Sequence, residues 1–154
     1  MPRTFSLQDE LTLPLPREEV FAFFADATNL EAITPPWLNF RILTPTPIEM
    51  RTGALIDYRL RLHGIPLSWR THISVWEPAR RFVDEQLRGP YSLWRHEHLF
   101  QDVGGGTRVI DRVEYAHLGG RWLDQLFVRP DLERIFAYRK QRTRELLTAT
   151  VGPE

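Results

Sequence analysis

The sequence predicts an α+β fold in which a curved antiparallel sheet of about seven strands wraps around a long C-terminal helix, with two short helices after the first strand. Two observations support this fold class. Residues 57–115 alternate apolar and polar side chains, which is typical of half-buried strands. Residues 120–148 instead carry apolar side chains at helical spacing, with charged residues between them. An apolar stripe on a helix and an apolar face on a sheet are expected to bury each other.

The first part of the chain predicts one strand followed by two short helices. The strand is expected at residues 4–13, where prolines end it. A helix then begins at Pro16, because proline suits a first helical turn and the two glutamates that follow suit the positive end of the helix dipole. A second helix at residues 30–33 ends before Pro35 and Pro36. We expect the two helices to close one end of the sheet.

Six further strands follow, separated by turn-forming glycine and proline residues, at 38–43, 53–63, 65–76, 81–88, 92–101 and 107–117. If each turn closes the nearest hairpin, Tyr58 faces Trp69 on the inner side of the sheet. The same registers place Glu97 beside Arg112 on the outer side. Opposite charges on neighbouring strands support this pairing.

The C-terminal helix contains a proline, Pro130, which is expected to kink the helix or to start a second helix after a short one. Trp122, Leu126 and Phe127 precede it and are expected on the mobile side of a cavity wall. The arginines of this helix, Arg139 among them, are expected on its solvated face. The helix near Pro130 and the loop at residues 35–36 are the expected entrance to the cavity.

Length and composition narrow the class of protein. The 154 residues correspond to about one domain, placed at residues 1–150, and 42% of them are apolar. The formal net charge is zero and there is no basic run, so a nucleic-acid partner is not expected. The chain has no cysteine, which excludes disulfides and thiolate metal sites. Because no apolar signal core and no apolar run of about 18 residues occurs, we expect a cytoplasmic protein without stable membrane insertion.

The inner face of the predicted sheet is aromatic but also carries charged and polar groups. Once the ion-paired residues are assigned outward, the inward side chains are Phe82, Asp84, Gln86, Trp94, His96, His98, Phe100, Val109, Asp111, Val113 and Tyr115. The registers pair Asp84 with His96 and Asp111 with His98. Buried polar groups need such partners, because burial without a hydrogen bond is costly. His117 is expected to be a surface or strand-end histidine.

Three interpretations of this polar band are open. The two Asp–His pairs are structural and fix the strand register, or they form a polar anchor at the bottom of a ligand cavity. In the second case, the carboxylate is expected to raise the pKa of the histidine beside it and to set its tautomer, which suits an acid/base group. In the third interpretation the two histidines and two aspartates ligate zinc or iron. Because each histidine already has an aspartate partner, we expect no metal and no cofactor.

Several groups of residues, together with the order of elements, resemble a known superfamily. They are Pro14-x-Pro16-x-x-x-Val20-Phe21-x-Phe23-Phe24, the segment from Asn29 to Pro36, Phe82-x-Asp84-x-Gln86-x-x-Gly89-Pro90-Tyr91-x-x-Trp94-x-His96-x-His98-x-Phe100, Asp111-x-Val113-x-Tyr115 and Ile135-Phe136-x-Tyr138-Arg139. This pattern resembles the START-like, or SRPBCC, superfamily, whose helix-grip fold occurs in the birch-pollen allergen, polyketide cyclases/aromatases and coenzyme-Q-binding proteins. The strand that contains the two histidines is similar to a bacterial subgroup described as polyketide cyclase/dehydrase-like.

The resemblance implies a deep hydrophobic cavity between sheet and helix that binds a lipid, a polyketide, a quinone or another small apolar molecule. The residues expected to bind it are Tyr58, Trp69, Phe82, Asp84, Gln86, Trp94, His96, His98, Asp111, Tyr115, Leu126 and Phe127. The alternative is a polyketide cyclase or dehydratase that uses His96 or His98, each paired with an aspartate, as its general acid/base. Superfamily members include both carriers and enzymes, so the resemblance leaves both functions open. The oligomeric state is also left open.

Overall fold

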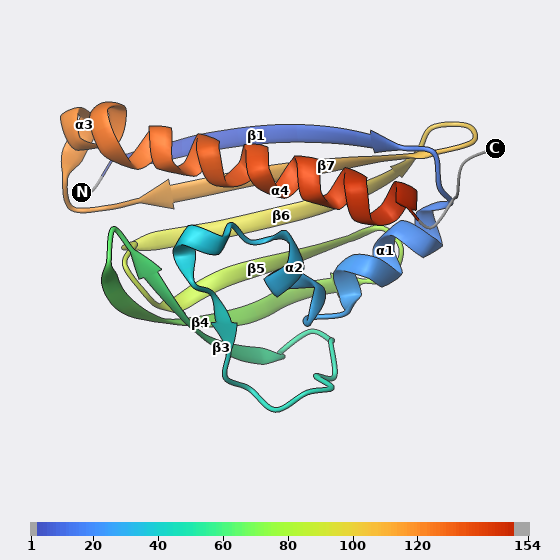
Figure 1. Ribbon diagram of the computed structural model, residues 1–154, viewed down its shortest axis with the longest axis horizontal. Helices are drawn as coiled ribbons and strands as arrows, with labels where there is room; N and C mark the ends of the chain where they lie inside the picture. The colour runs from blue at the N-terminus through green and yellow to red at the C-terminus, as the bar shows by residue number, and fades with distance from the viewer. Residues whose placement is uncertain (1–2, 150–154) are drawn as a thin grey trace.

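The computed structural model describes residues 3–149, in which a curved sheet holds one long helix against its concave face (Figure 1). The strands are β1 (Thr4–Leu13), β2 (Arg41–Ile42), β3 (Leu55–Leu62), β4 (Ile65–Glu77), β5 (Arg81–Arg88), β6 (Leu93–Asp102) and β7 (Thr107–Ala116). The helical segments are α1 (Arg17–Ala25), α2 (Asn29–Ile33), the 3₁₀ turn η1 (Pro36–Leu38), α3 (Gly120–Leu123), the π-helix η2 (Asp124–Val128) and α4 (Arg129–Ala149). The predicted α+β helix-grip fold is confirmed.

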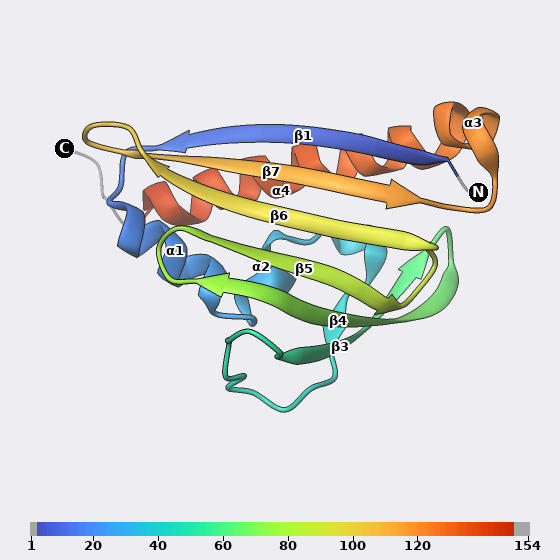
Figure 2. The ribbon, with the colours of Figure 1, turned by 180° about the vertical axis from the view of Figure 1, so that it is seen from behind.

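The sheet is antiparallel, with the strand order β1-β7-β6-β5-β4-β3-β2. Seen from behind, its convex face carries no helix of residues 3–149, whereas α4, α1 and α2 all lie on the concave side (Figure 2). The predicted registers are confirmed, because Tyr58 opposes Trp69 and Glu97 opposes Arg112. The side chains of Glu97 and Arg112 approach to 3.9 Å on the convex face. The outward charges therefore identified the inward face correctly.

One predicted strand differs from the structure, and the region of Pro130 has a more detailed form than the sequence indicated. The strand expected at residues 38–43 is reduced to Arg41–Ile42, because Leu38 ends a 3₁₀ turn and Asn39 adopts the left-handed conformation with φ 48°. Near Pro130 the short segments α3 and η2 end at Val128, and α4 begins at Arg129 without a gap, in keeping with the expected start of a second helix after a short one. A π-turn directly before Pro130 accommodates the missing N–H and the ring that would clash with a regular turn.

Two clusters of the core lie at opposite ends of α4. Phe21, Phe24, Phe100 and Leu147 belong to the cluster at the α1 end. A second cluster, at the α3 end, contains Trp94, Val113, Tyr115, Leu132 and Phe136. No helix in residues 3–149 is both long enough and apolar enough to cross a lipid bilayer.

A buried carboxylate fastens the start of the C-terminal helix to the sheet. Asp124 of η2 accepts a hydrogen bond from the hydroxyl of Tyr115 at 2.8 Å and one from Nε2 of His117 at 3.1 Å. Nδ1 of His117 accepts the N–H of Gly119 at 3.2 Å, so its ring proton is on Nε2. His117 directly follows β7, as expected for a strand-end histidine, but its ring is buried and stacks on Phe5 at 5.2 Å.

We expect Asp124→Ala to lower the free energy of unfolding by about 2 kcal/mol, since two buried donors lose their acceptor. Asp124→Asn keeps one acceptor oxygen and is expected to lose less than Asp124→Ala. Urea unfolding followed by tryptophan fluorescence measures both variants. Equal losses in the two variants would contradict the role of the hydrogen bonds.

Candidate functional site

A cavity of about 190 Å³ lies between the concave face of the sheet and α4. This is larger than the apolar cavity of roughly 150 Å³ that is known to hold benzene. Most of its lining is apolar, and the aromatic side chains that contribute to it include Phe24, Phe40, Tyr58, Trp69, Trp94 and Phe136. A concave, largely apolar space with a few polar groups is the usual form of a small-molecule site.

Seven of the residues predicted to bind a ligand line this cavity. They are Tyr58, Trp69, Phe82, Asp84, Trp94, His96 and His98. They come from β3, β4, β5 and β6, which are neighbours in the sheet. Alternation of side chains along the strands brings them to one face, as the sequence predicted. Their role in binding stays a prediction.

The structure places three other predicted residues away from the cavity lining. Gln86 is hydrogen-bonded to the backbone of Tyr91, whose N–H donates to its Oε1 at 3.1 Å and whose carbonyl accepts from its Nε2 at 2.6 Å. It therefore closes the β5–β6 turn. Asp111 lies on β7 behind the two histidines, and the hydroxyl of Tyr115 is bound to Asp124.

Leu126 and Phe127 do not form a cavity wall. Their side chains are 62% and 60% exposed, on the outer side of η2. Asp124 points inward from the same π-helix and turns these two residues away from the sheet. Leu132 and Ile135, one and two turns further along, line the cavity from the helix side instead.

The aspartates and histidines pair across the diagonal of the strands. Nε2 of His98 lies 2.6 Å from Oδ2 of Asp84, and Nε2 of His96 lies 2.8 Å from Oδ1 of Asp111. The predicted partners, Asp84 with His96 and Asp111 with His98, do oppose each other in the register. The prediction that these opposing residues hydrogen-bond to each other is nevertheless wrong, because long side chains on neighbouring strands reach diagonal neighbours as readily as opposite ones.

Ring stacking holds both histidines in place. The imidazoles of His96 and His98 stack with their centroids 3.7 Å apart and their planes 24° apart. Phe82 stacks on His98 at 4.0 Å, and Phe136 of α4 meets His96 nearly edge-on at 5.4 Å. The histidines are thus fixed by packing as well as by the aspartates.

Arg139 of α4 completes the polar cluster, which also contains Asp84, His96, His98 and Asp111. Its Nη2 lies 3.3 Å from Nδ1 of His98 and 3.6 Å from Oδ1 of Asp111. The prediction of a solvated position is wrong, because only 15% of this side chain is exposed. Helical spacing could have predicted this inward position. Arg139 is three residues after Phe136 and four after Ile135, so it shares their inward face.

Burial and charge act in opposite directions on the aspartates. Burial raises the pKa of Asp111, but the positive charge of Arg139 and the hydrogen bond from His96 outweigh it and hold that pKa well below its usual value. Burial also raises the pKa of Asp84, but the hydrogen bond from His98 and the nearby positive charges lower it by more, so the net shift is downward. Both side chains are therefore carboxylates at neutral pH.

His96 behaves differently from what its aspartate partner suggested. Burial, assisted by the neighbouring His98, lowers the pKa of His96 to about 4 against the opposing effect of Asp111. The carboxylates act in the expected direction and raise the pKa of His96, but the net shift is downward, because the cost of burying an imidazolium is greater than their attraction. His96 is thus neutral at physiological pH.

The hydrogen bonds define the tautomer of each ring. An arginine only donates, so Nδ1 of His98 accepts from Arg139 and its Nε2–H donates to Asp84. Neutral His96 donates its Nε2–H to the Asp111 carboxylate. Its Nδ1 keeps a free lone pair, since no hydrogen bond to this atom is formed within residues 3–149 and its nearest ionic partner, Asp84, is 3.9 Å away. The cluster therefore offers the cavity an acceptor of hydrogen bonds.

Three residues of the polar cluster also carry atoms that could act as metal ligands. Asp84, His96 and His98 each present a ligand atom within 4.8 Å of the other two. Two histidines and one carboxylate are a common ligand set for iron. Here Nε2 of His98 already donates to Asp84 at 2.6 Å, so a metal bound between these two residues would have to replace that hydrogen bond. Arg139 also contributes a positive charge next to the site. The arrangement therefore suits hydrogen bonding better than metal coordination.

Fold and site together define a helix-grip protein of the SRPBCC superfamily, with a cavity between its sheet and its C-terminal helix. The chain belongs to the family described as polyketide cyclase / dehydrase and lipid transport, which matches residues 13–142. No curated protein sequence matches the chain.

Solved structures of the same fold include an aromatase/cyclase. The Zhui aromatase/cyclase from Streptomyces sp. R1128 is 15% identical with a TM-score of 0.77, over 97% of this chain and 96% of that one. A protein from Thermus thermophilus is 17% identical with a TM-score of 0.70, over 95% and 99%. Ara h 8.0201 is 13% identical with a TM-score of 0.72, over 96% and 99%. At these identities the likeness shows the fold alone.

Proposed function

We propose that the protein binds a small hydrophobic molecule in the cavity between the sheet and α4. The observation that carries this proposal is an aromatic cavity of about 190 Å³ with one polar cluster on its wall. The family to which the chain belongs, whose description includes lipid transport, supports the same function. An apolar ligand body gains free energy by leaving water, and the polar cluster orients it.

The free lone pair of His96 indicates which polar group the ligand carries. An imidazole nitrogen that accepts a hydrogen bond selects a hydroxyl or N–H group. Tyr58 also lines the cavity, and burial raises the pKa of its phenol, so it stays neutral and able to donate. A planar, mostly apolar ligand with a hydroxyl and a carbonyl group would satisfy both side chains.

Native mass spectrometry of freshly purified protein tests this function directly, because a bound hydrophobic ligand adds its mass to the protein. Titration with the fluorescent probe 1-anilinonaphthalene-8-sulfonate provides a second measurement. The proposal would be refuted if the purified protein carried no ligand and the probe did not bind in the cavity.

A cavity-blocking variant locates the binding. We expect Ile135→Trp to weaken binding of the probe at least about tenfold, because Ile135 lines the cavity and an added indole fills much of its volume. Ala137→Trp is the matched control, since Ala137 lies on the exposed face of the same helix. Thermal unfolding of both variants shows whether the fold is retained. Equal probe affinity in the two variants would place the probe outside the cavity.

The free nitrogen of His96 supports an enzyme as the second candidate function. A cyclase or dehydratase would use His96 or His98 to remove a proton from an acidic C–H group of a polyketide-like substrate. A conjugate acid with a pKa of about 4 makes His96 a weak base, which favours ligand binding over this alternative. Solvent deuterium exchange into an aryl 1,3-diketone measures the reaction. Exchange that persists in both His96→Gln and His98→Gln would exclude this mechanism.

A further inference from the structure

Exposed apolar side chains are concentrated at the start of the C-terminal helix. We call the set Leu118, Trp122, Leu123, Leu126 and Phe127 the apolar tip. Five of the eleven large apolar residues that are exposed in the described chain belong to it, with exposures from 40% to 95%. Trp122 and Leu126, like Leu123 and Phe127, are separated by four residues and are neighbours on the helix surface. An apolar patch this dense usually marks a contact surface.

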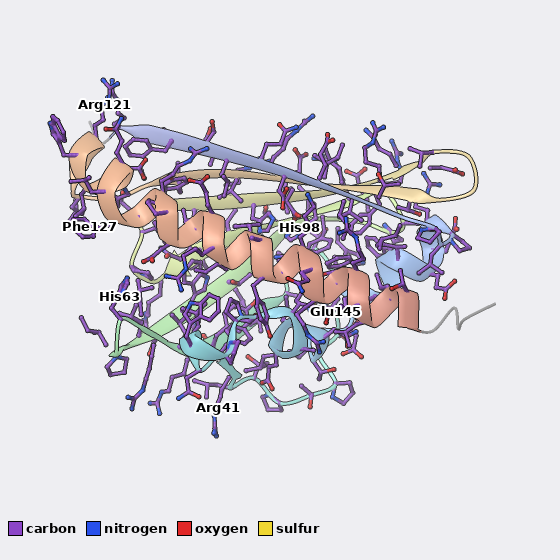
Figure 3. All side chains as sticks on the ribbon, turned by 45° about the horizontal axis from the view of Figure 1, so that its top comes forward. Arg41, His63, His98, Arg121, Phe127 and Glu145 are labelled. Carbon is purple, nitrogen blue, oxygen red and sulfur yellow. The ribbon has the colours of Figure 1, made fainter. Side chains whose placement is uncertain are left out.

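Positive charge borders the apolar tip. Arg3, Arg121 and Arg129 surround a shallow hollow between the start of β1 and the α3–η2 segment. The carboxylate in this hollow, Asp124, is buried and engaged by Tyr115 and His117, so it does not cancel the arginines at the surface. Arg129 forms an ion pair with Glu133 at 3.8 Å, so Arg3 and Arg121 supply the net positive charge. Figure 3 shows Arg121 and Phe127 projecting at the same end of the molecule.

We propose that the apolar tip and its arginines dock this end of the protein on the surface of an anionic lipid bilayer. Trp, Phe and Leu side chains enter the boundary between headgroups and acyl chains, while arginines bind the phosphate groups above it. The helix lies on the bilayer rather than crossing it, in keeping with the absence of a membrane-crossing helix in residues 3–149.

The charges favour a bilayer over a second copy of the chain. In a two-fold contact the same patch meets itself, so Arg3 and Arg121 of one copy would approach those of the other. Like charges brought together at an interface oppose association, whereas phosphate groups would neutralise them.

The docking end adjoins one end of the cavity. Leu62 of β3 and Leu132 of α4 both line the cavity, and the residues next to them, His63 and Asp131, form a hydrogen bond across the gap. Figure 3 shows His63 at the same end of the long axis as Phe127. Docking does not depend on an occupied cavity, so its test is separate from that of ligand binding.

Co-sedimentation with vesicles tests the docking surface. We expect the protein to bind vesicles of phosphatidylcholine mixed with phosphatidylglycerol about tenfold or more tightly than vesicles of phosphatidylcholine alone, and to lose this preference at high salt. Trp122→Ala/Phe127→Ala is expected to weaken binding about tenfold, and Arg3→Gln/Arg121→Gln to abolish the preference for anionic lipid.

The control is Leu43→Ala/Leu87→Ala, which removes two exposed apolar side chains that do not belong to the tip and is expected to bind like the wild type. No binding to either vesicle, or wild-type binding by the Trp122→Ala/Phe127→Ala variant, would overturn the proposal. Analytical ultracentrifugation tests whether the tip instead binds a second copy of the chain. A dimer that disappears in the Trp122→Ala/Phe127→Ala variant would assign the tip to a second copy and would likewise overturn it.

Discussion

Replacing Arg139 with methionine is expected to lower the free energy of unfolding by about 3–5 kcal/mol at neutral pH. The guanidinium lies 3.6 Å from Asp111, and its positive charge lowers the pKa of two largely buried carboxylates, Asp84 and Asp111. Methionine keeps most of the packing against Phe24 and Phe136, which the guanidinium contacts at 5.6 and 5.8 Å. The loss should therefore reflect uncompensated buried charge rather than a cavity.

The effect of Arg139→Met is expected to depend on pH. A carboxyl group whose folded pKa is lowered contributes stability above its unfolded pKa, here 3.8, and this contribution is lost as the pH falls through the folded pKa. Without the charge of Arg139, the variant loses a large part of the stability that the two ionised carboxylates contribute. The difference between variant and wild type should thus be largest at neutral pH and should shrink once the carboxylates are protonated.

Urea unfolding at neutral and at acid pH measures this difference. Arg144→Met is the control, because Arg144 is exposed on the same helix and its loss should change stability by less than about 0.5 kcal/mol. A loss in Arg139→Met no greater than that of the control would show that Arg139 does not stabilise the polar cluster.

The second large effect is acid destabilisation through His96. Its pKa is 6.5 in the unfolded chain and about 4 in the folded protein, so the unfolded state binds the additional proton between these values. Stability contributed by the neutral ring is fully present above pH 6.5 and is lost as the pH falls to 4. The shift corresponds to about 3 kcal/mol.

His96→Gln should flatten this part of the stability profile. The glutamine amide is expected to donate to Asp111 as the imidazole does, but it does not titrate. Unfolding free energies measured across the window for wild type and variant isolate the contribution of His96. Nuclear magnetic resonance of the ring protons provides an independent measurement, and a midpoint above pH 6 for His96 would contradict the effect of burial.

Charge patterns on the outer face made most of the fold predictable. Glu97 and Arg112 can face each other only in one register, and a period of two then defines the inner face. The same reasoning placed Asp84, His96 and His98 on the cavity wall. It could not decide which histidine binds which aspartate, because the diagonal pairing depends on the directions in which the side chains leave twisted strands.

The apolar tip was harder to place from sequence. Trp122, Leu126 and Phe127 fit a helical apolar stripe, and the regular period suggested that they face the sheet. The π-turn of η2 adds a residue to the turn and changes the phase of the helix, so Asp124 faces inward and the tip faces outward. Spacing identifies apolar residues but not what covers them.

The sequence by itself determined the antiparallel registers, the helix-grip fold and the inward position of two histidines and two aspartates. Local periodicity and opposite charges carry this information, because each depends only on neighbours along or across the strands. Tertiary structure alone decided the role of Arg139, the low pKa of His96 and the exposure of the apolar tip. These properties depend on burial and on contacts between α4 and the sheet, which are distant in sequence and set by packing.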